Sequence, residues 1–338
     1  MRGWLAALLA RHWWQSSPTP LARTLQPLAA LYGALAARHK ARSVAQTLPV
    51  PVVVVGNFIV GGAGKTPTVL ALVQALRAAG HRPGVISRGH GRAGGAARPV
   101  EPASAASVVG DEPLLIRRRS GVPVWVAKSR PAAARGLCAL HPEVDVLVSD
   151  DGLQHHALAH QAALVVFDER GAGNGLLLPA GPLREALPKR MPAAMRVLYT
   201  AGRASTPLPG VLALRHIESA WPLQAWWTGG ESLAQPLASL RGRPLLAVAG
   251  LAAPEQFFSM LEALGLSITR LPLLDHHTYA TPPWPADTPD VITTEKDAVK
   301  IVALPPGSTR VWVVPLDLQL PAGLVEELIA LLFPPAAP

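Results

Sequence analysis

The chain has 338 residues, enough for one large domain or two of ordinary size. Hydrophobic residues make up 49% of it, which excludes a disordered chain and predicts a globular protein with a substantial core. The single cysteine, Cys138, excludes an internal disulfide and a cysteine-based metal cluster.

The net charge of +9 comes from the first third of the sequence. Residues 1–100 contain 12 Lys and Arg residues and no acidic residue, because the first one is Glu101. A basic surface of this kind attracts anionic lipid headgroups, nucleic acids or phosphorylated substrates. A basic surface that only meets solvent is the alternative.

Apolar residues recur at helical spacing in residues 21–37, and Pro27 is expected to start or kink this helix. One side of it carries Leu21, Leu25, Leu28, Tyr32 and Leu35. The preceding residues 1–14 are rich in Trp and Leu, interrupted by Arg and His.

Neither N-terminal piece has the ~20 uninterrupted apolar residues of a membrane-spanning helix. The apolar run 5–10 is short for a signal peptide, whereas an acid-free, Arg-rich start also allows a transit peptide. Trp, Leu and Arg together suit helices that lie in a membrane interface. Packing on the protein's own core is the alternative, and the pattern leaves both open.

Apolar runs of strand length recur along the rest of the chain, with helical patterns between several of them. The predicted strands are 51–56, 83–87, 122–127, 144–149, 162–167, 196–200, 244–249, 290–293 and 310–315. The predicted helices are 67–79, 129–140, 254–264 and 322–332. This alternation predicts an α/β fold with parallel sheets covered on both faces. Residues 201–243 break the rhythm, so we expect a domain junction there and a smaller α/β unit from residue 244 onward.

A glycine-rich turn links the first apolar strand to a helix, and the stretch reads VVVVGNFIVGGAGKTP over residues 52–67. A strand, a glycine turn and Lys-Thr at a helix start are the context of a P-loop, whose backbone amides close around phosphate oxygens. The general pattern has glycine at the position of Ile59, so Gly61 and Gly62 are expected to make the turn. The predicted nucleotide-binding residues are Ile59, Val60, Gly61, Gly62, Ala63, Gly64, Lys65 and Thr66.

A P-loop needs a carboxylate from a neighbouring strand to hold Mg²⁺. The apolar run 144–149 ends at Asp150 and Asp151, either of which is expected to hold Mg²⁺ directly or through water. Thr66 is expected to add its hydroxyl as a ligand, and Lys65 to reach the β- and γ-phosphates. A plain Asp-Gly turn is the alternative.

The guanine-reading pattern Asn/Thr-Lys-X-Asp is not found. Lys296 and Asp297 are adjacent, which is the wrong spacing, so we predict ATP rather than GTP.

Together these motifs resemble the tetraacyldisaccharide 4′-kinase family, the lipid A 4′-kinases of Gram-negative bacteria. The resemblance covers most of the chain, and its ordered motifs are far more specific than a P-loop alone. The matching segments are Pro27-Leu28, GNFIVGGAGKTP (56–67), Ser87-Arg88-Gly89, Gly110-Asp111-Glu112-Pro113, SDDGLQH (149–155), GNGLLLPAGPLRE (173–185), LAVAGLAAPEQFF (246–258), DHHTY (275–279) and TTEKDAVK (293–300).

The resemblance implies a kinase of lipid A (lipopolysaccharide) biosynthesis that moves the γ-phosphate of ATP to the 4′-hydroxyl of a tetraacylated glucosamine disaccharide 1-phosphate. It also implies a peripheral protein on the cytoplasmic face of the bacterial inner membrane. The expected partners are this lipid A precursor and the membrane surface; no nucleic acid and no protein partner is implied.

The resemblance also suggests a domain organisation, with the active site between two domains. Residues 1–47 are expected to form amphipathic membrane-associated helices that belong to the core domain. Residues 48–215 are expected to form the P-loop core, and residues 216–338 a linker and the smaller α/β domain.

Asp111 is the candidate base for the acceptor hydroxyl, although Gly-Asp-Glu-Pro alone fits a helix start with acids in its first turn equally well. The resemblance favours the catalytic role and makes His276 the histidine that partners Asp111. His277 is chemically equivalent, and only its place in the motif disfavours it. Lys65 completes the predicted catalytic set.

The resemblance also points to four substrate contacts. Arg184 is expected to clamp the 1-phosphate or the transferring phosphate, and Glu185 to assist the metal, with a surface salt bridge as the alternative. Gln154 and His155 are expected to face the active site. The roles of five further residues stay open: Asn174, His277, Glu295, Lys296 and Asp297.

The chain departs from the family pattern in two places. His90 stands where the family often has Tyr, and His160 with Gln161 stands where we expect Arg-Asp, so roles for these positions are in doubt.

Two other kinds of function share the P-loop. A nucleotide switch or metallochaperone would need neither the apolar N-terminus nor a base at Asp111. A non-enzymatic membrane adaptor would not need to keep Lys65, Thr66, Asp150 and Asp151 intact.

Overall fold

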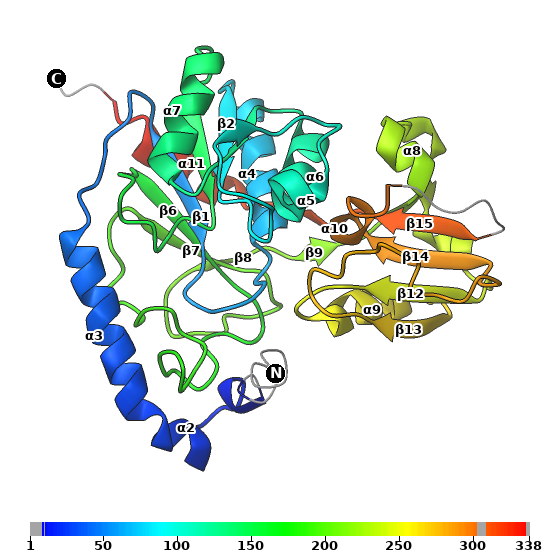
Figure 1. Ribbon diagram of the computed structural model, residues 1–338, viewed down its shortest axis with the longest axis horizontal. Coiled ribbons are helices and arrows are strands. Elements are labelled where there is room, and N and C mark those ends of the chain that lie inside the picture. The colour runs from blue at the N-terminus through cyan, green and yellow to red at the C-terminus, as the bar shows by residue number, and fades with distance from the viewer. Residues whose placement is uncertain (1–8, 10, 303–308, 336–338) are drawn as a thin grey trace.

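The computed structural model describes residue 9 and residues 11–302 and 309–335; most of the Trp- and Leu-rich stretch at residues 1–10 therefore lies outside the described residues. Two units, each built on its own β-sheet, lie side by side, with α2 (Pro20–Thr24) and α3 (Gln26–Arg42) along the outside of the first unit (Figure 1).

The first sheet has eight strands in the order β3-β4-β2-β5-β1-β6-β7-β8. Neighbouring strands are parallel except β3 and β4, which are antiparallel. The strands are β1 (Val52–Gly56), β2 (Pro83–Ser87), β3 (Arg98–Pro99), β4 (Val124–Val126), β5 (Val146–Asp150), β6 (Ala162–Phe167), β7 (Met195–Tyr199) and β8 (Val211–Leu212).

Helices cover both faces of this sheet because its central strands are apolar on both sides. Val53 and Val55 of β1 belong to the hydrophobic cluster on the α4 side, whereas Val52 and Val54 belong to the cluster on the α7 side. The helices of this unit are α4 (Lys65–Ala78), α5 (Ala106–Val109), α6 (Asp111–Ser120), α7 (Arg130–Leu140) and α11 (Ala322–Leu332). The sheet is thus packed on both faces, which leaves the loops at the ends of its strands as the places open to solvent or a ligand.

The second sheet has six strands in the order β11-β10-β15-β14-β12-β13, of which the last four are parallel. The strands are β10 (Ser219–Pro222), β11 (Gln235–Pro236), β12 (Leu245–Ala249), β13 (Ile268–Pro272), β14 (Asp290–Thr294) and β15 (Arg310–Val314). The helices are α8 (Leu223–Thr228), α9 (Pro254–Ala263) and α10 (Glu295–Ala298), with 3₁₀ turns η1 (Glu231–Leu233) and η2 (Leu237–Leu240). Phe257, Phe258 and Leu261 of α9 fill one face of the sheet.

The chain crosses between the units twice, at β9 (Arg215–His216) and β16 (Asp317–Leu318), which pair as an antiparallel ribbon. After β16, helix α11 packs against α4 and β6 of the first unit. The apolar face of α11 is thus buried on the first unit, although the expected range of the second domain, 216–338, includes this helix. We propose that the second domain ends near β16.

The apolar runs and periodic stretches predicted the main elements correctly. All nine predicted strands and all four predicted helices are present, with ends shifted by a few residues at most. Pro27 lies in the first turn of α3, directly after the break that separates α3 from α2, as expected. None of the described helices has the length and apolar character needed to cross a membrane.

Helix α3 packs on the protein through one narrow side only. Ala29 is buried, and the Tyr32 hydroxyl donates to the carbonyl oxygen of Arg184 at 3.0 Å. Leu28, Leu31 and Leu35 are 54%, 57% and 59% exposed, and their spacing puts them on one side of the helix. Part of the predicted apolar stripe therefore faces away from the protein.

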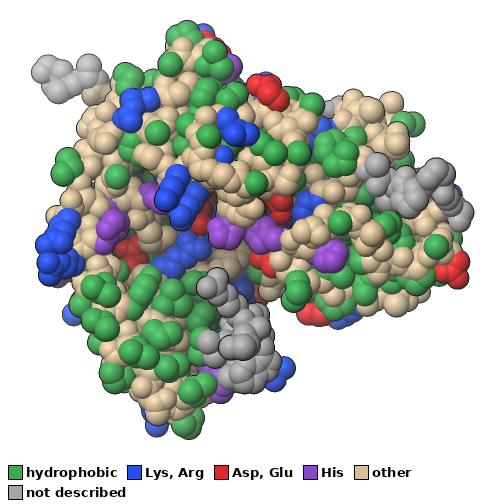
Figure 2. Space-filling view, viewed as in Figure 1, with side chains coloured by type: hydrophobic (Ala, Val, Ile, Leu, Met, Phe, Trp, Pro, Cys, Tyr) green, Lys and Arg blue, Asp and Glu red, His purple; other side chains and the backbone are tan. Residues whose placement is uncertain are grey.

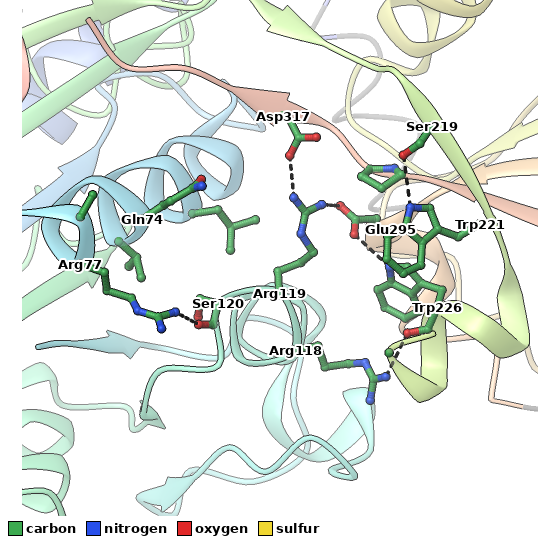
Figure 3. A pocket seen from close by; sticks show the side chains of 15 residues that line it. Gln74, Arg77, Arg118, Arg119, Ser120, Ser219, Trp221, Trp226, Glu295 and Asp317 are labelled. Atoms are coloured by element: carbon green, nitrogen blue, oxygen red, sulfur yellow. Dashed lines mark hydrogen bonds and ion pairs between the residues drawn. The ribbon is translucent and has the colours of Figure 1, made fainter. Parts of the chain in front are cut away.

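Charged and histidine side chains gather in the middle of the molecule's face, where the two units meet (Figure 2). A cavity of about 720 Å³ also lies at this junction, lined by the second half of α4, the end of α6 and the second sheet (Figure 3). In it, Arg119 donates to Glu295 and Asp317, at 2.6 Å each, and Trp226 Nε1 donates to Glu295 at 2.9 Å. Arg119 thus ties α6 to α10 and β16.

We expect Arg119→Met to lower the free energy of unfolding by about 3 kcal/mol, because it leaves the buried Glu295 carboxylate without its cation. Urea denaturation followed by tryptophan fluorescence measures this. The double variant Arg119→Met/Glu295→Gln should recover most of the loss. Arg270→Met, which breaks the exposed pairs with Glu255 and Glu262, is the control and should cost less than about 1 kcal/mol. Equal losses in Arg119→Met and Arg270→Met would contradict a special role of Arg119.

Candidate active site

The carboxyl ends of the parallel strands in both sheets meet at the junction between the units. In the first sheet, loops carrying the P-loop, Asp151 and Arg170 follow β1, β5 and β6. Asp111 starts α6, which comes after β2, β3 and α5 along the chain. In the second, loops carrying Ala252, His276 and Lys296 follow β12, β13 and β14. A methyl group built on Gly62 would lie 3.7 Å from Ala252 Cβ, so the two sets of loops are in contact. The edge where ligands bind in open α/β sheets is therefore shared by both units.

The P-loop turns at Gly61 and Gly64, whose φ angles are +86° and +82°. Gly62 is not among the residues with a positive φ, so the left-handed conformations of the loop are at Gly61, as expected for a turn, and at Gly64, which was not predicted for it. Ile59 is fully buried and forms a bridge with Leu183, which explains why glycine is not needed there. Thr66 follows as the second residue of α4.

The backbone amides of residues 61–66 are available to a ligand. Within the described part of the chain, none of them donates a hydrogen bond to a protein acceptor. Lys65 Nζ donates to Asn57 Oδ1 at 3.2 Å and lies 3.5 Å from Asp151 Oδ1. A row of free amides at the start of a helix, with a lysine beside it, is the arrangement that binds phosphate.

The surroundings of Asp150 and Asp151, the acid pair at the end of β5, shift the pKa values of the two side chains in opposite directions. Burial raises the pKa of Asp150 to about 6, and the neighbouring Asp151 carboxylate adds to this; Ser87 Oγ donates to Asp150 at 3.0 Å. Burial also opposes ionisation of Asp151, but Lys65 and Arg184 outweigh it and hold the pKa of Asp151 below its usual range. Asp151 has a φ of +49°, a strained conformation that the surrounding contacts must maintain.

The predicted substrate residues form one network with Asp151. Arg184 Nη1 donates to both Asp151 oxygens at 3.2 Å and to Gln154 Oε1 at 3.3 Å. Gln154 Nε2 in turn donates to Glu185 Oε1 at 2.9 Å. His155 lies beside this network; burial, together with Arg130 and Arg88, lowers the pKa of His155 to about 4, so the imidazole is neutral at pH 7.

Asp111 and His276 meet across the junction of the two units. Asp111 is the first residue of α6, and its Oδ2 lies 3.0 Å from His276 Nδ1. The hydrogen bond with Asp111 raises the pKa of His276 against the opposing effect of burial. His277 instead packs edge-on against Tyr279, with ring centroids 4.9 Å apart. Of the two histidines, only His276 contacts the candidate base.

Asp111, Glu112 and His276 are close enough together to resemble a metal-binding set. Lysines already neutralise it, since Lys296 Nζ lies 2.9 Å from Glu112 and Lys300 Nζ lies 3.8 Å from Asp111. Burial disfavours the Glu112 carboxylate, but Lys296 outweighs burial and holds the pKa of Glu112 below its usual range. The arrangement suits a carboxylate kept ionised beside a histidine better than a metal site.

The residues whose roles were left open now have contacts. Lys296 pairs with Glu112 and Glu295 pairs with Arg119, so both residues link the two units. Lys296 also lies 3.0 Å from Asp275 within the second unit. Asp297 is internal to the second unit, where it accepts from the Gly250 amide at 3.0 Å. Asn174 is buried and donates to Ala180 O at 2.9 Å, which makes it a turn residue.

His90, one of the positions that departs from the family pattern, lies at the junction. Its ring centroid is 5.6 Å from that of His276. The departure is therefore next to the candidate base rather than remote from it.

Three basic residues of the site were not among those predicted from the sequence motifs. Arg130 is buried and donates to the carbonyl oxygens of Asp150 and Asp151 at 2.7 and 3.1 Å. Arg170 donates to the carbonyl oxygen of Gly62 in the P-loop, and Lys300 lies beside Asp111. Arg170 lies three residues after the predicted strand 162–167, and Lys300 is the last residue of the segment 293–300. Neither position predicted these contacts, and no motif contained Arg130.

Known proteins resemble the chain along nearly its whole length. A model of the family "Tetraacyldisaccharide-1-P 4′-kinase" matches residues 21–332. The tetraacyldisaccharide 4′-kinase of Leptothrix cholodnii is 52% identical over 338 residues, covering 97% of this chain and 96% of that protein. The enzyme of the same name from Methylibium petroleiphilum is 52% identical over 323 residues, covering 93% and 90%.

The fold is also that of a known structure. A crystal structure of LpxK from Aquifex aeolicus in complex with ATP matches with a TM-score of 0.74 and 24% identity, covering 93% of this chain and all of that one. The family match and these relatives show that the chain belongs to the tetraacyldisaccharide 4′-kinase family.

Proposed function

We propose that the protein transfers the γ-phosphate of ATP to the 4′-hydroxyl of a tetraacylated glucosamine disaccharide 1-phosphate, a step of lipid A biosynthesis. The membership of the chain in this kinase family supports the reaction. The observation that carries the proposal is the joint placement of a P-loop, an acid pair and an Asp–His pair at one sheet edge. A nucleotide switch or a membrane adaptor would not require the Asp–His pair.

The P-loop is the proposed site of the ATP phosphates. Its free amides and Lys65 would donate hydrogen bonds to the phosphate oxygens and so hold the γ-phosphorus in line with the acceptor oxygen. The acceptor oxygen forms a bond to this phosphorus while the bond to the bridging oxygen of ADP breaks. Arg184, next to Asp151, is placed to contact either the transferring phosphate or the substrate's 1-phosphate.

Asp111 is the proposed base. Its ionised carboxylate accepts the proton of the 4′-hydroxyl as the new bond forms, and the Nδ1–H of His276 orients the carboxylate from the other unit. Because Asp111 lies on one unit and His276 on the other, the pair is complete only when the two units are in contact.

The acid pair fits Mg²⁺, which the family implies. Asp150, Asp151 and Thr66 provide the oxygen ligands that Mg²⁺ prefers, and a cation there would offset the burial and the Asp151 charge that raise the pKa of Asp150. Bound there, Mg²⁺ would neutralise charge on the phosphates. Glu185, joined to Asp151 through Gln154 and Arg184, is placed to support these ligands.

We propose that α3 lies on a membrane surface, so that the protein is peripheral on the cytoplasmic face of the inner membrane. The exposed side of Leu28, Leu31 and Leu35 supports this, and the last turn of α3 carries basic residues that suit anionic headgroups. Hydrophobic side chains are also spread over the surface around α3 in Figure 2.

A direct assay tests the proposed reaction. Protein, Mg²⁺, ATP labelled at the γ-phosphate and the disaccharide lipid are incubated, and the lipid is extracted and counted. We expect label on the lipid, and Lys65→Ala should lose at least about 99% of the rate because a phosphate contact is removed. Wild-type rates in Lys65→Ala, with unchanged folding by circular dichroism, would contradict the role of the P-loop.

Asp111→Asn should lower kcat by about 10² to 10⁴, because the amide keeps the shape of the side chain but cannot accept the proton. The KM for ATP should change little. Asp145→Asn is the matched control, because Asp145 lies just before the amino end of β5, whereas the candidate site lies at the carboxyl ends of the strands. If Asp111→Asn lowered only the melting temperature, Asp111 would be a helix-start residue and not the base.

The triple variant Leu28→Asn/Leu31→Asn/Leu35→Asn should bind vesicles of anionic phospholipid at least about tenfold more weakly, because three apolar side chains no longer enter the interface. Co-sedimentation with the vesicles measures this. The control replaces three exposed leucines elsewhere, Leu140, Leu212 and Leu233. Equal binding by the two triple variants would remove the support for α3 as the contact surface.

A further inference from the structure

Arg170 makes a contact with the P-loop that the proposed reaction does not use. It follows β6, and its Nη2 donates to the carbonyl oxygen of Gly62. Gly62 lies between Gly61 and Ala63 in the turn that surrounds the proposed phosphates, so Arg170 holds the backbone of the loop and not a side chain.

The guanidinium of Arg170 is itself fixed by its neighbours. Asp168, which is only 1% exposed, accepts from Arg170 Nη2 at 2.6 Å and from Nε at 2.9 Å. The Arg170 amide also donates to Asp168 Oδ1 at 3.0 Å. The ring of Trp14 lies with its centroid 4.5 Å from Arg170 Cζ, a cation–π distance. The hydrogen bond to Gly62 therefore comes from a donor with little freedom to move.

The geometry of the peptide bond gives this contact a consequence for phosphate binding. In a trans peptide the carbonyl and the N–H point in opposite directions. Fixing the Gly62 carbonyl toward Arg170 therefore fixes the Ala63 N–H to point away from Arg170. Glycines on both sides of this peptide leave the loop otherwise free to take many conformations, and ordering them on binding costs entropy.

We propose that Arg170 is a positioning residue for the phosphate-binding loop. It holds the Gly62–Ala63 peptide in one orientation before ATP binds and so lowers the cost of ordering the loop. It does not need to touch the phosphates to do this.

Trp14 extends this arrangement to the N-terminal segment. Trp13 Nε1 donates to Pro179 O at 2.9 Å, and Trp13 O accepts from the Asn174 amide at 2.8 Å, so the segment is anchored on the first unit. Trp14 then covers the guanidinium from the side of that segment. The N-terminal segment and the P-loop are thus separated by one side chain, that of Arg170.

The inference rests on the proposed function only in taking ATP as the ligand of the P-loop. Calorimetric titration with Mg²⁺ and a non-hydrolysable ATP analogue tests it without lipid or turnover. Arg170→Gln should raise the Kd of the analogue about tenfold, the effect of losing a charged hydrogen bond. Arg170→Lys should give an intermediate Kd, because an ammonium keeps the charge but cannot replace the second donor, Nε, that holds the side chain against Asp168. Trp14→Leu should raise the Kd roughly threefold.

A double variant separates positioning from stability, because Arg170→Gln also leaves the buried Asp168 without its cation. In Asp168→Asn/Arg170→Gln the melting temperature should recover while the Kd stays raised. Arg196→Gln is the matched control. Arg196 also pairs with a carboxylate, that of Glu327, but it lies at the start of β7, at the end of the sheet away from the P-loop, so its loss should leave the Kd unchanged.

Two results would overturn the inference: an unchanged Kd in Arg170→Gln, or a normal Kd in the double variant. In turnover, the KM for ATP should rise with the Kd, and because KM does not depend on the fraction of folded enzyme, a loss of active protein alone would not reproduce it. A protein that bound the analogue but did not label the lipid would contradict the proposed reaction and leave this test intact.

Discussion

The contact between two parallel sheets at their carboxyl ends is the constraint on which the site depends. It brings Asp111 to His276 across 165 positions of sequence. A contact at one point would leave the units free to rotate about it. Helix α6 is attached at both ends instead, through Asp111 and Glu112 at its start and Arg119 at its end. Asp111 and Arg119 are eight residues apart in this helix, so the attachments are about 12 Å apart, which fixes the direction of α6 as well as its position.

Both acidic clusters of the site contain carboxylates paired with cations, since Asp151 lies next to Lys65 and Arg184. The difference between the clusters lies in the burial of Asp150. The Asp111 and Glu112 carboxylates each have a lysine nearby, so little uncompensated charge remains. Asp150 is buried and accepts a hydrogen bond from Ser87, and burial together with the neighbouring Asp151 carboxylate raises the pKa of Asp150 to about 6. We therefore propose Asp150 and Asp151 as the cation site, and the other cluster as the site that accepts a proton beside a histidine.

Much of the fold followed from local sequence patterns, because apolar strands and amphipathic helices are specified by nearby residues. The P-loop and the acid pair were also predictable, since each occupies a few consecutive positions. Arg119 and Arg170 were not, because their partners lie 176 and 108 positions away and no local pattern records such pairs. The packing of α11 on the first unit could not be predicted for the same reason, because the sequence of α11 specifies a helix but not which sheet buries it. The turn at Gly61 and Gly64 was misassigned in part because glycine permits a positive φ without requiring it.

The proposed acceptor has apolar acyl chains at one end and a phosphorylated sugar headgroup at the other. The segment 173–185 connects α3, the proposed membrane helix, with the proposed phosphate site. Tyr32 of α3 donates to the backbone of Arg184, and Lys40 at the other end of α3 lies 3.7 Å from Glu185. The side chain of Arg184 pairs with Asp151 at the proposed metal site. The helix proposed to lie on the membrane is therefore attached to the residues proposed to hold the phosphates. An acceptor whose acyl chains remain in the membrane beside α3 would have its sugar headgroup on the side of α3 that contacts Arg184. We therefore propose that the lipid stays in the bilayer during phosphoryl transfer.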